Sequence, residues 1–197
     1  ESYLEGKEYE EIASSEVWYE ERTDFSRAAA GTDRISHKEV RGYELLQGKK
    51  VFEGRLLGGC LESLYDILTT TRYADEKAVC EKYGIFPPRE EWTGKILFVE
   101  TCEEKPQPAL LEKELKALKD RGVFDVVAGV IVGKPQDEAF YEEYKDIWKK
   151  TVNNDQLPIV YNVNFGHATP RCALQYGTMA RVDMEKKVII FYKPIDR

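Results

Sequence analysis

The sequence has 197 residues, of which 42% are apolar and 33% are charged, and its formal net charge is −7. This length fits one domain, or one domain with an appendage, and the apolar fraction is enough for a sizeable core. Acidic and basic residues are interspersed without a lysine or arginine block, so binding to a nucleic-acid backbone is not expected. No apolar run approaches the roughly 18 residues of a membrane-spanning helix, and no signal peptide is visible, so no membrane partner is expected.

The four cysteines are Cys60, Cys80, Cys102 and Cys172, and they form neither a C-x-x-C pair nor a metal-binding spacing. In a chain of this length we interpret them as reduced thiols of a cytosolic protein. Neither a metal nor another cofactor is expected. The first residue is Glu1 rather than Met, and we interpret the sequence as a fragment of a longer protein.

The N-terminal region is charged, with scattered aromatic residues. Residues 1–11 are expected to be the end of a helix leading in. Residues 14–25, SSEVWYEERTDF, are typical of an edge strand or a packed loop, although Trp18 also offers a stacking face for a flat ligand. Residues 27–39 are predicted to be a loop in which His37 is solvated.

A double glycine follows two predicted short strands. Residues 43–48 and 51–54 are expected as strands around a turn, and residues 55–57 as a strand end. Gly58 and Gly59 then predict a tight turn into a helix whose N–H groups suit a carboxylate or phosphate. The alternative is close packing of helix on strand. Residues 69–91 are expected to be an irregular loop, because they carry Gly84, Pro87 and Pro88.

Strand and helix patterns alternate over the second half of the chain. The expected elements are a strand at 95–100, a helix at 108–121, a strand at 124–132, a helix at 138–150 and a strand at 159–165. This alternation implies parallel strands joined by crossover helices. A closing hairpin over 180–183 and 187–191, with the N-terminal strands, adds antiparallel pairs. The predicted fold class is α/β: a β/β/α domain with a mixed sheet and parallel central strands.

Two candidate catalytic groups stand at strand ends. Glu100 closes the strand KILFVE, and His167 follows the strand-ending Gly166. A carboxylate and an imidazole are two thirds of a hydrolytic triad, although a solvated glutamate and a structural histidine are the ordinary alternatives. No serine lies in a G-x-S-x-G elbow. Cys60, at a predicted helix start, could have a lowered thiol pKa, so a Cys-His-Glu hydrolase is conceivable.

Four motifs, in order, resemble the C-terminal domain of the serine LD-carboxypeptidase family, and most closely its microcin-immunity (MccF-like) branch. They are RLLGG (55–59), KILFVE (95–100), GVIVGKPQDE (129–138) and NVNFGHATPR (162–171). The resemblance implies a two-domain serine peptidase in which this swivelling domain supplies Glu100 and His167. The nucleophile domain would be missing from this chain, which would be inactive alone.

By the same resemblance, residues 1–13 are the tail of the interdomain connection and residues 14–197 the C-terminal domain, with homodimers expected. Substrates of the microcin-immunity branch are aminoacyl- or peptidyl-nucleotides, and Trp18 matches a tryptophan that helps hold the nucleobase. Substrate contacts are also expected from Gly58, Gly59, Cys60 and Lys105. Cys60 stands where many relatives have asparagine, which weakens any inherited contact there.

Three other functions stay open. The first is the muropeptide LD-carboxypeptidase of cell-wall recycling, and Lys105 does not discriminate it, since it could meet either a phosphate or a carboxylate. The second is a self-contained hydrolase that uses Cys60. The third is a non-catalytic binding or dimerisation module.

Overall fold

The computed structural model describes residues 9–70 and 72–192. In that part of the chain the helices are α1 (Leu61–Thr69), α2 (Glu76–Tyr83), α3 (Pro108–Asp120) and α4 (Tyr141–Val152). The strands are β1 (Tyr9–Ala13), β2 (Val17–Tyr19), β3 (Ser36–Lys38), β4 (Glu44–Gln47), β5 (Val51–Cys60), β6 (Ile96–Glu100), β7 (Gly129–Gly133), β8 (Ile159–Val163), β9 (Met179–Asp183) and β10 (Val188–Tyr192). Short 3₁₀ turns lie at Arg89–Trp92, Val123–Asp125 and Gln136–Glu138.

One eight-stranded mixed sheet has the order β1-β10-β9-β5-β6-β7-β8-β4. Strands β5, β6, β7 and β8 are parallel neighbours, and the remaining strand pairs are antiparallel. Helix α3 connects β6 to β7 and α4 connects β7 to β8, as continuous apolar strands with crossover helices predict. The predicted fold class is therefore confirmed.

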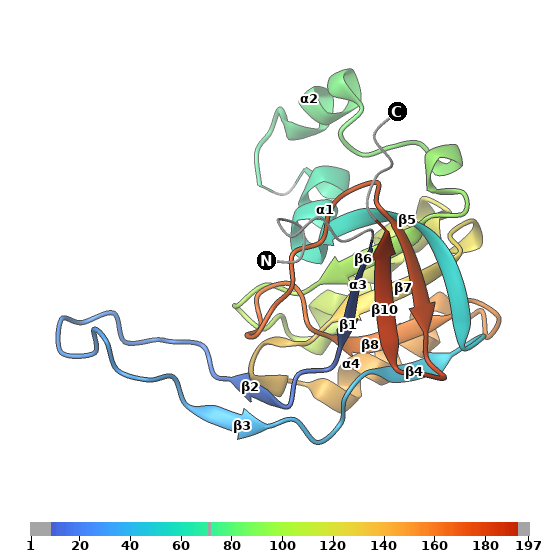
Figure 1. Cartoon of the computed structure of the whole chain (residues 1–197). Coiled ribbons are helices and arrows are strands. Elements are labelled where there is room, and N and C mark those ends of the chain that lie inside the picture. The colour runs from blue at the N-terminus through green and yellow to red at the C-terminus, as the bar shows by residue number, and fades with distance from the viewer. Residues whose placement is uncertain (1–8, 71, 193–197) are drawn as a thin grey trace.

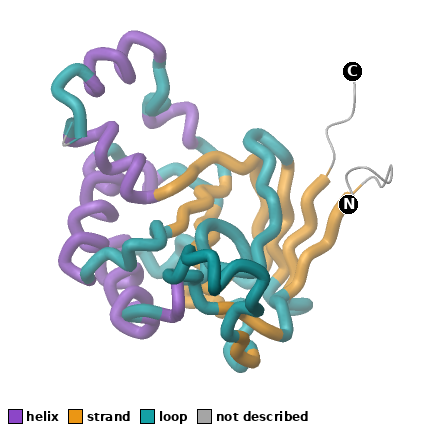
Figure 2. Tube along the Cα trace, turned by 90° about the vertical axis from the view of Figure 1, so that its left-hand side faces the viewer, coloured by secondary structure: helices purple, strands orange, loops and turns teal. Residues whose placement is uncertain are grey.

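The helices gather on one side of the strands (Figure 2). On that side, the apolar faces of α3 and α4 pack on β6, β7 and β8 through residues such as Leu115, Trp148 and Val130. On the opposite side, Phe98 and Val160 of the parallel strands share a second apolar cluster with Ile189 of β10. Two cores on opposite sides of the parallel strands give the expected β/β/α layering.

Strand β5 belongs to both halves of the sheet. Its first half pairs antiparallel with β9, and its second half pairs parallel with β6, from Leu56↔Ile96 to Cys60↔Glu100. The predicted tight turn at Gly58 and Gly59 is therefore wrong, because both residues continue the strand. A Cβ on Gly58 would lie 1.7 Å from the Phe98 carbonyl oxygen, which explains the glycine.

A two-stranded hairpin of β2 and β3 projects from the body (Figure 1). We call residues 17–38 the β2–β3 hairpin. His37 lies in β3, so the prediction of a loop is wrong there; its side chain is 40% exposed, with Nε2 2.7 Å from Glu20 Oε1. No helix in the described ranges is long and apolar enough to cross a membrane.

Three other predictions differ from the structure. The expected N-terminal helix is wrong for residues 9–11, which lie in β1 opposite β10; residues 1–8 lie outside the described ranges. Helix α2 occupies part of the expected loop at residues 69–91. The apolar run at 124–132 begins as a 3₁₀ turn and becomes strand only at Gly129.

Candidate active site at the carboxyl ends of the parallel strands

The structure brings Glu100 and His167 into direct contact. Glu100 is the last residue of β6, and His167 lies in the loop after β8. The Glu100 Oε2 atom lies 2.7 Å from His167 Nδ1 and accepts the His167 backbone N–H at 3.1 Å. Because an ionised carboxylate only accepts hydrogen bonds, Nδ1 carries a proton, and Nε2 is the ring nitrogen that can gain or lose one. This is the carboxylate–imidazole arrangement of a hydrolytic triad.

Two glycines make room for the Glu100 side chain. A Cβ on Gly133 would lie 2.7 Å from Glu100 Cβ, and one on Gly166 would lie 2.6 Å from both Glu100 Cγ and Oε2. Gly166 also has a φ of +92°, a conformation that side chains disfavour. The carboxylate is only 8% exposed, so its orientation is fixed by main chain on two sides.

The electrostatic environment favours a basic imidazole. Burial raises the pKa of Glu100, and the hydrogen bond and charge of His167 oppose this rise. Partial burial lowers the pKa of His167, but the hydrogen bond and charge of Glu100 outweigh it, and Glu103 adds to the rise. The net pKa of His167 is therefore above its ordinary value.

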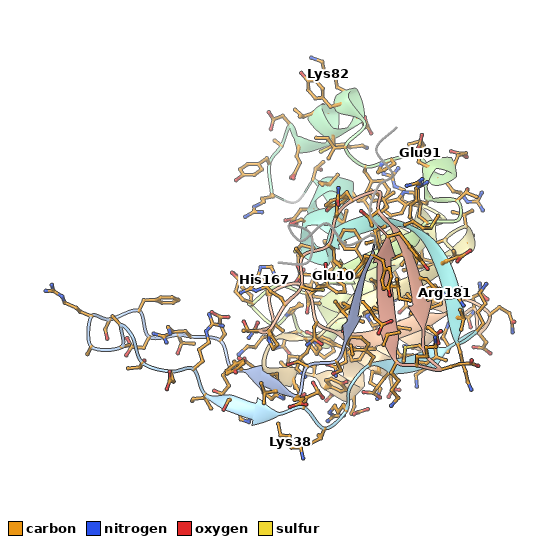
Figure 3. All side chains as sticks on the ribbon, in the orientation of Figure 1. Glu10, Lys38, Lys82, Glu91, His167 and Arg181 are labelled. Carbon is orange, nitrogen blue, oxygen red and sulfur yellow. The ribbon has the colours of Figure 1, made fainter. Side chains whose placement is uncertain are left out.

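Glu103 is a site residue that the sequence did not indicate. Its Oε2 lies 3.1 Å from Nε2 of His167, so the imidazole lies between two carboxylates, which favour the imidazolium with a proton on each ring nitrogen. The Glu103 side chain is 57% exposed, in contrast to the buried Glu100. The basic nitrogen of the dyad thus faces an exposed side of the sheet, and Figure 3 shows His167 on the side from which the β2–β3 hairpin projects.

Cys60 lies beside Glu100 in the β5–β6 ladder but does not resemble a nucleophile. Burial raises its thiol pKa to about 11, and the nearby Glu62 carboxylate contributes to this rise. Its Sγ donates a hydrogen bond to Glu62 Oε2 at 3.2 Å. The expected lowering of the thiol pKa at a helix start is therefore wrong, because burial and a neighbouring negative charge disfavour the thiolate.

Trp18 lies in β2, and two side chains lie over its ring. The His37 ring stacks on it at a centroid distance of 4.2 Å, and Lys134 Nζ lies 5.0 Å from the Trp18 ring centroid. The next residue along β2, Tyr19, donates its N–H to the carbonyl of Thr169, two residues after His167. A backbone hydrogen bond therefore connects the strand that carries Trp18 with the loop that carries His167.

Lys105 is already paired in the structure. Its Nζ lies 2.5 Å from Asp137 Oδ2, and Asp137 Oδ1 accepts the backbone N–H of Glu21 at 2.9 Å. Lys105, the predicted substrate contact, is thus paired with a protein carboxylate. Through Asp137 this pair connects the loop after β6 with the loop after β7 and with the β2–β3 hairpin.

A buried ion cluster, also missed from the sequence, supports the base of the hairpin. Lys134 follows β7, and its side chain is 1% exposed. Its Nζ lies 2.9 Å from Glu39 Oε2, 2.5 Å from Glu138 Oε1 and 3.2 Å from Asn162 Oδ1. Burial opposes ionisation of Glu39, but the hydrogen bond and charge of Lys134, together with backbone N–H groups of Arg41 and Gly42, lower the Glu39 pKa below its ordinary value. The described residues contain no group of three or more His, Cys, Asp or Glu side chains that could hold a metal ion.

Relatives of known structure share this fold. An MccF-like protein from Streptococcus pneumoniae, in complex with AMP, is 53% identical and covers 92% of this chain and 52% of its own, with a TM-score of 0.88. MccF in complex with glutamyl sulfamoyl guanosine is 21% identical, covers 96% of this chain and 51% of its own, and has a TM-score of 0.70.

Sequence relatives agree with this likeness. The microcin C7 self-immunity protein MccF of Escherichia coli is 26% identical over 145 residues, 72% of this chain and 37% of its own length. A putative carboxypeptidase of Treponema pallidum is 33% identical over 98 residues, 48% of this chain and 28% of its own. The chain spans about half the length of the related structures and a smaller share of the length of the two sequence relatives. The family model for the LD-carboxypeptidase C-terminal domain matches residues 53–182, and the chain therefore belongs to this peptidase family.

Proposed function

We propose that this chain supplies the glutamate and histidine of a Ser-Glu-His triad in a peptidase that hydrolyses aminoacyl- or peptidyl-nucleotides. The observation that carries the proposal is the contact of the buried Glu100 carboxylate with Nδ1 of His167. Among the described residues, Glu103 rather than a hydroxyl or thiol lies at hydrogen-bond distance from Nε2. The serine would come from a nucleophile domain outside this sequence.

In the proposed mechanism, one atom of the dyad, Nε2 of His167, accepts and donates the proton. Nε2 of His167 would take the proton of the serine hydroxyl as the hydroxyl oxygen attacks the acyl carbonyl carbon. The same nitrogen would then donate this proton to the leaving group, which departs and leaves an acyl-serine. Nε2 would next take a proton from the water that attacks this ester and return it to the serine oxygen, releasing the acid. Glu100 would hold the tautomer and stabilise the imidazolium that forms between these steps.

The substrate class is supported by the relatives and by Trp18. The relatives include structures in complex with AMP, glutamyl sulfamoyl guanosine and aspartyl sulfamoyl adenosine, each an adenine or guanine nucleotide or analogue. In this chain Trp18 lies on a hairpin that bonds to the His167 loop, and the His37 ring is stacked on it. A flat nucleobase is a natural partner for such an aromatic ring.

The test is hydrolysis of an aminoacyl sulfamoyl adenosine. The chain would be assayed alone, mixed with a separately produced nucleophile domain, and in the same mixture with the His167→Gln variant. We expect turnover only with the wild-type mixture. Activity of the chain alone would refute the split triad, as would full activity of the His167→Gln mixture.

The muropeptide LD-carboxypeptidase is the second candidate, and the family description favours it. A nucleobase role for Trp18 separates the two candidates. Trp18→Ala should raise KM for the nucleotide conjugate more than for a muropeptide tetrapeptide. An equal change in both would count against stacking.

The other two functions are tested by the same assay. A Cys60 hydrolase would turn over substrate without a partner domain and would be blocked by iodoacetamide; the raised thiol pKa argues against it. A binding or homodimerisation module would leave hydrolysis by the two-domain protein unchanged when His167 is replaced.

A further inference from the structure

Glu103 places an exposed negative charge beside Nε2 of the dyad. Its Oε2 lies 3.1 Å from Nε2 of His167, and more than half of its side chain is exposed. In a serine triad the nucleophile's hydroxyl needs this same position at Nε2. The Glu103 carboxylate must therefore turn aside when the nucleophile is in place, while its backbone stays in the loop after β6.

The distances of acyl transfer keep that carboxylate near the acyl group. A general base lies about 2.6–3.2 Å from the oxygen it deprotonates. That oxygen lies roughly 3–3.5 Å from the carbonyl carbon in a near-attack arrangement. The carbonyl carbon is therefore within about 6 Å of Nε2, and the α-nitrogen is two bonds further. A carboxylate displaced from Nε2 by a side-chain rotation remains within reach of that nitrogen.

The neighbouring charges leave Glu103 available for a cation. Lys105, the cation in the same loop, is paired with Asp137 at 2.5 Å. Arg171 directs its Nη1 to the Gly166 carbonyl oxygen at 3.1 Å. On the other side of the imidazole, Glu100 is buried and committed to Nδ1. An exposed carboxylate that loses its imidazole partner to the nucleophile favours a new positive partner.

We propose that Glu103 is a specificity-determining residue that binds the α-ammonium group of an aminoacyl substrate. The site then prefers aminoacyl conjugates with a free amine to N-acylated, peptidyl-type conjugates, whose nitrogen is neutral. This inference rests on the proposed function and selects between the two substrate types that it leaves open.

The test compares alanyl sulfamoyl adenosine with its N-acetyl derivative. These two probes differ only at the α-nitrogen, since the alanine side chain carries no charge. The enzyme is the nucleophile domain together with this chain, in wild-type form and with Glu103→Gln. We expect the wild-type kcat/KM to favour the free amine by about fivefold to tenfold, as for a half-exposed charge pair. Glu103→Gln should remove this preference, mainly through KM for the free amine.

The matched control is Glu104→Gln, which removes the same charge from the next residue and should keep the preference. Glu103→Lys should reverse it. An unchanged ratio in Glu103→Gln, with hydrolysis retained, overturns the inference but not the proposed function. If Glu103→Gln is inactive on both probes, Glu103→Asp must restore both activity and preference, and its failure also overturns the inference. Absence of hydrolysis by the wild-type protein overturns the proposed function, and the inference with it.

Discussion

Replacing Glu100 with glutamine tests the role of its negative charge, because the size of the side chain hardly changes. The side chains have nearly the same size, and the site around Glu100 is closed by Gly133 and Gly166. Glutamine would therefore stay in place, but it would remove the negative charge that faces His167 Nδ1 and replace one acceptor oxygen with an NH2 donor. The pKa of His167, which Glu100 raises in the wild-type chain, should fall.

The size of the effect follows from the contact. A carboxylate and an imidazolium with charge centres about 4 Å apart interact by roughly 4 kcal/mol at an effective dielectric constant of 20. The imidazole side chain is 37% exposed, so solvent screens a large part of this energy. Keeping about a third leaves ~1.4 kcal/mol, which corresponds to about a tenfold loss in proton affinity of the imidazole.

The assay is an NMR titration of the two histidines in the chain. His37 is the internal control, because its partner is Glu20 and not Glu100. Only His167 should bind its proton more weakly in the Glu100→Gln variant. An unchanged His167 titration, or equal changes in both histidines, would refute the reasoning that the Glu100 charge governs the imidazole.

The same substitution predicts a change in the pH dependence of the assembled enzyme. A general base must be unprotonated, so a raised His167 pKa moves the acid limb of kcat/KM to higher pH. In Glu100→Gln this limb should move to lower pH, while kcat falls by up to about 10⁴-fold because the tautomer is no longer enforced. An acid limb that stays in place would mean that another group controls it.

The remaining predictions concern stability and use urea unfolding. Gly166→Ala should lower the free energy of unfolding by about 1–3 kcal/mol from backbone strain, and further through its clash with Glu100. Gly177→Ala, at φ +75° in open space, carries the strain without the clash, so an equal loss would contradict the packing argument. Lys134→Met leaves the buried Glu39 carboxylate without its cation and should cost about 3–5 kcal/mol. Lys77→Met, which removes an exposed i,i+4 pair, should leave stability nearly unchanged.

The parallel core was predictable because its signals are local. Strands β6 and β8 are buried at every position, and such strands are continuous apolar runs in the sequence. Helix α3 has Pro108 at its start and leucines at helical spacing on its buried face. Helix α2 has only Cys80 buried, so its sequence carries no apolar stripe to indicate a helix.

The candidate site also contains residues that a local sequence pattern indicated and residues that it did not. Glu100 and His167 could be proposed because each stands where an apolar run ends. The contact of Glu103 with Nε2 depends on the path of a loop, which no local pattern specifies. The Lys134–Glu39 pair joins residues 95 positions apart, and its burial depends on how the hairpin base meets β7. The double glycine misled because a strand and a turn both use glycine, and only the neighbouring Phe98 decides between them.

The unequal exposure of the two carboxylates beside His167 has a consequence for how ligands bind. Glu100 loses its rotational freedom when the chain folds, so aligning it requires no further ordering when a substrate arrives. Glu103 is exposed and must be ordered anew in each binding event, at an entropic cost that depends on the ligand. An inhibitor that contacts both Nε2 of His167 and the Glu103 carboxylate would therefore bind more tightly if its own scaffold were rigid. Further contacts to Glu100, which is already ordered, would add little affinity.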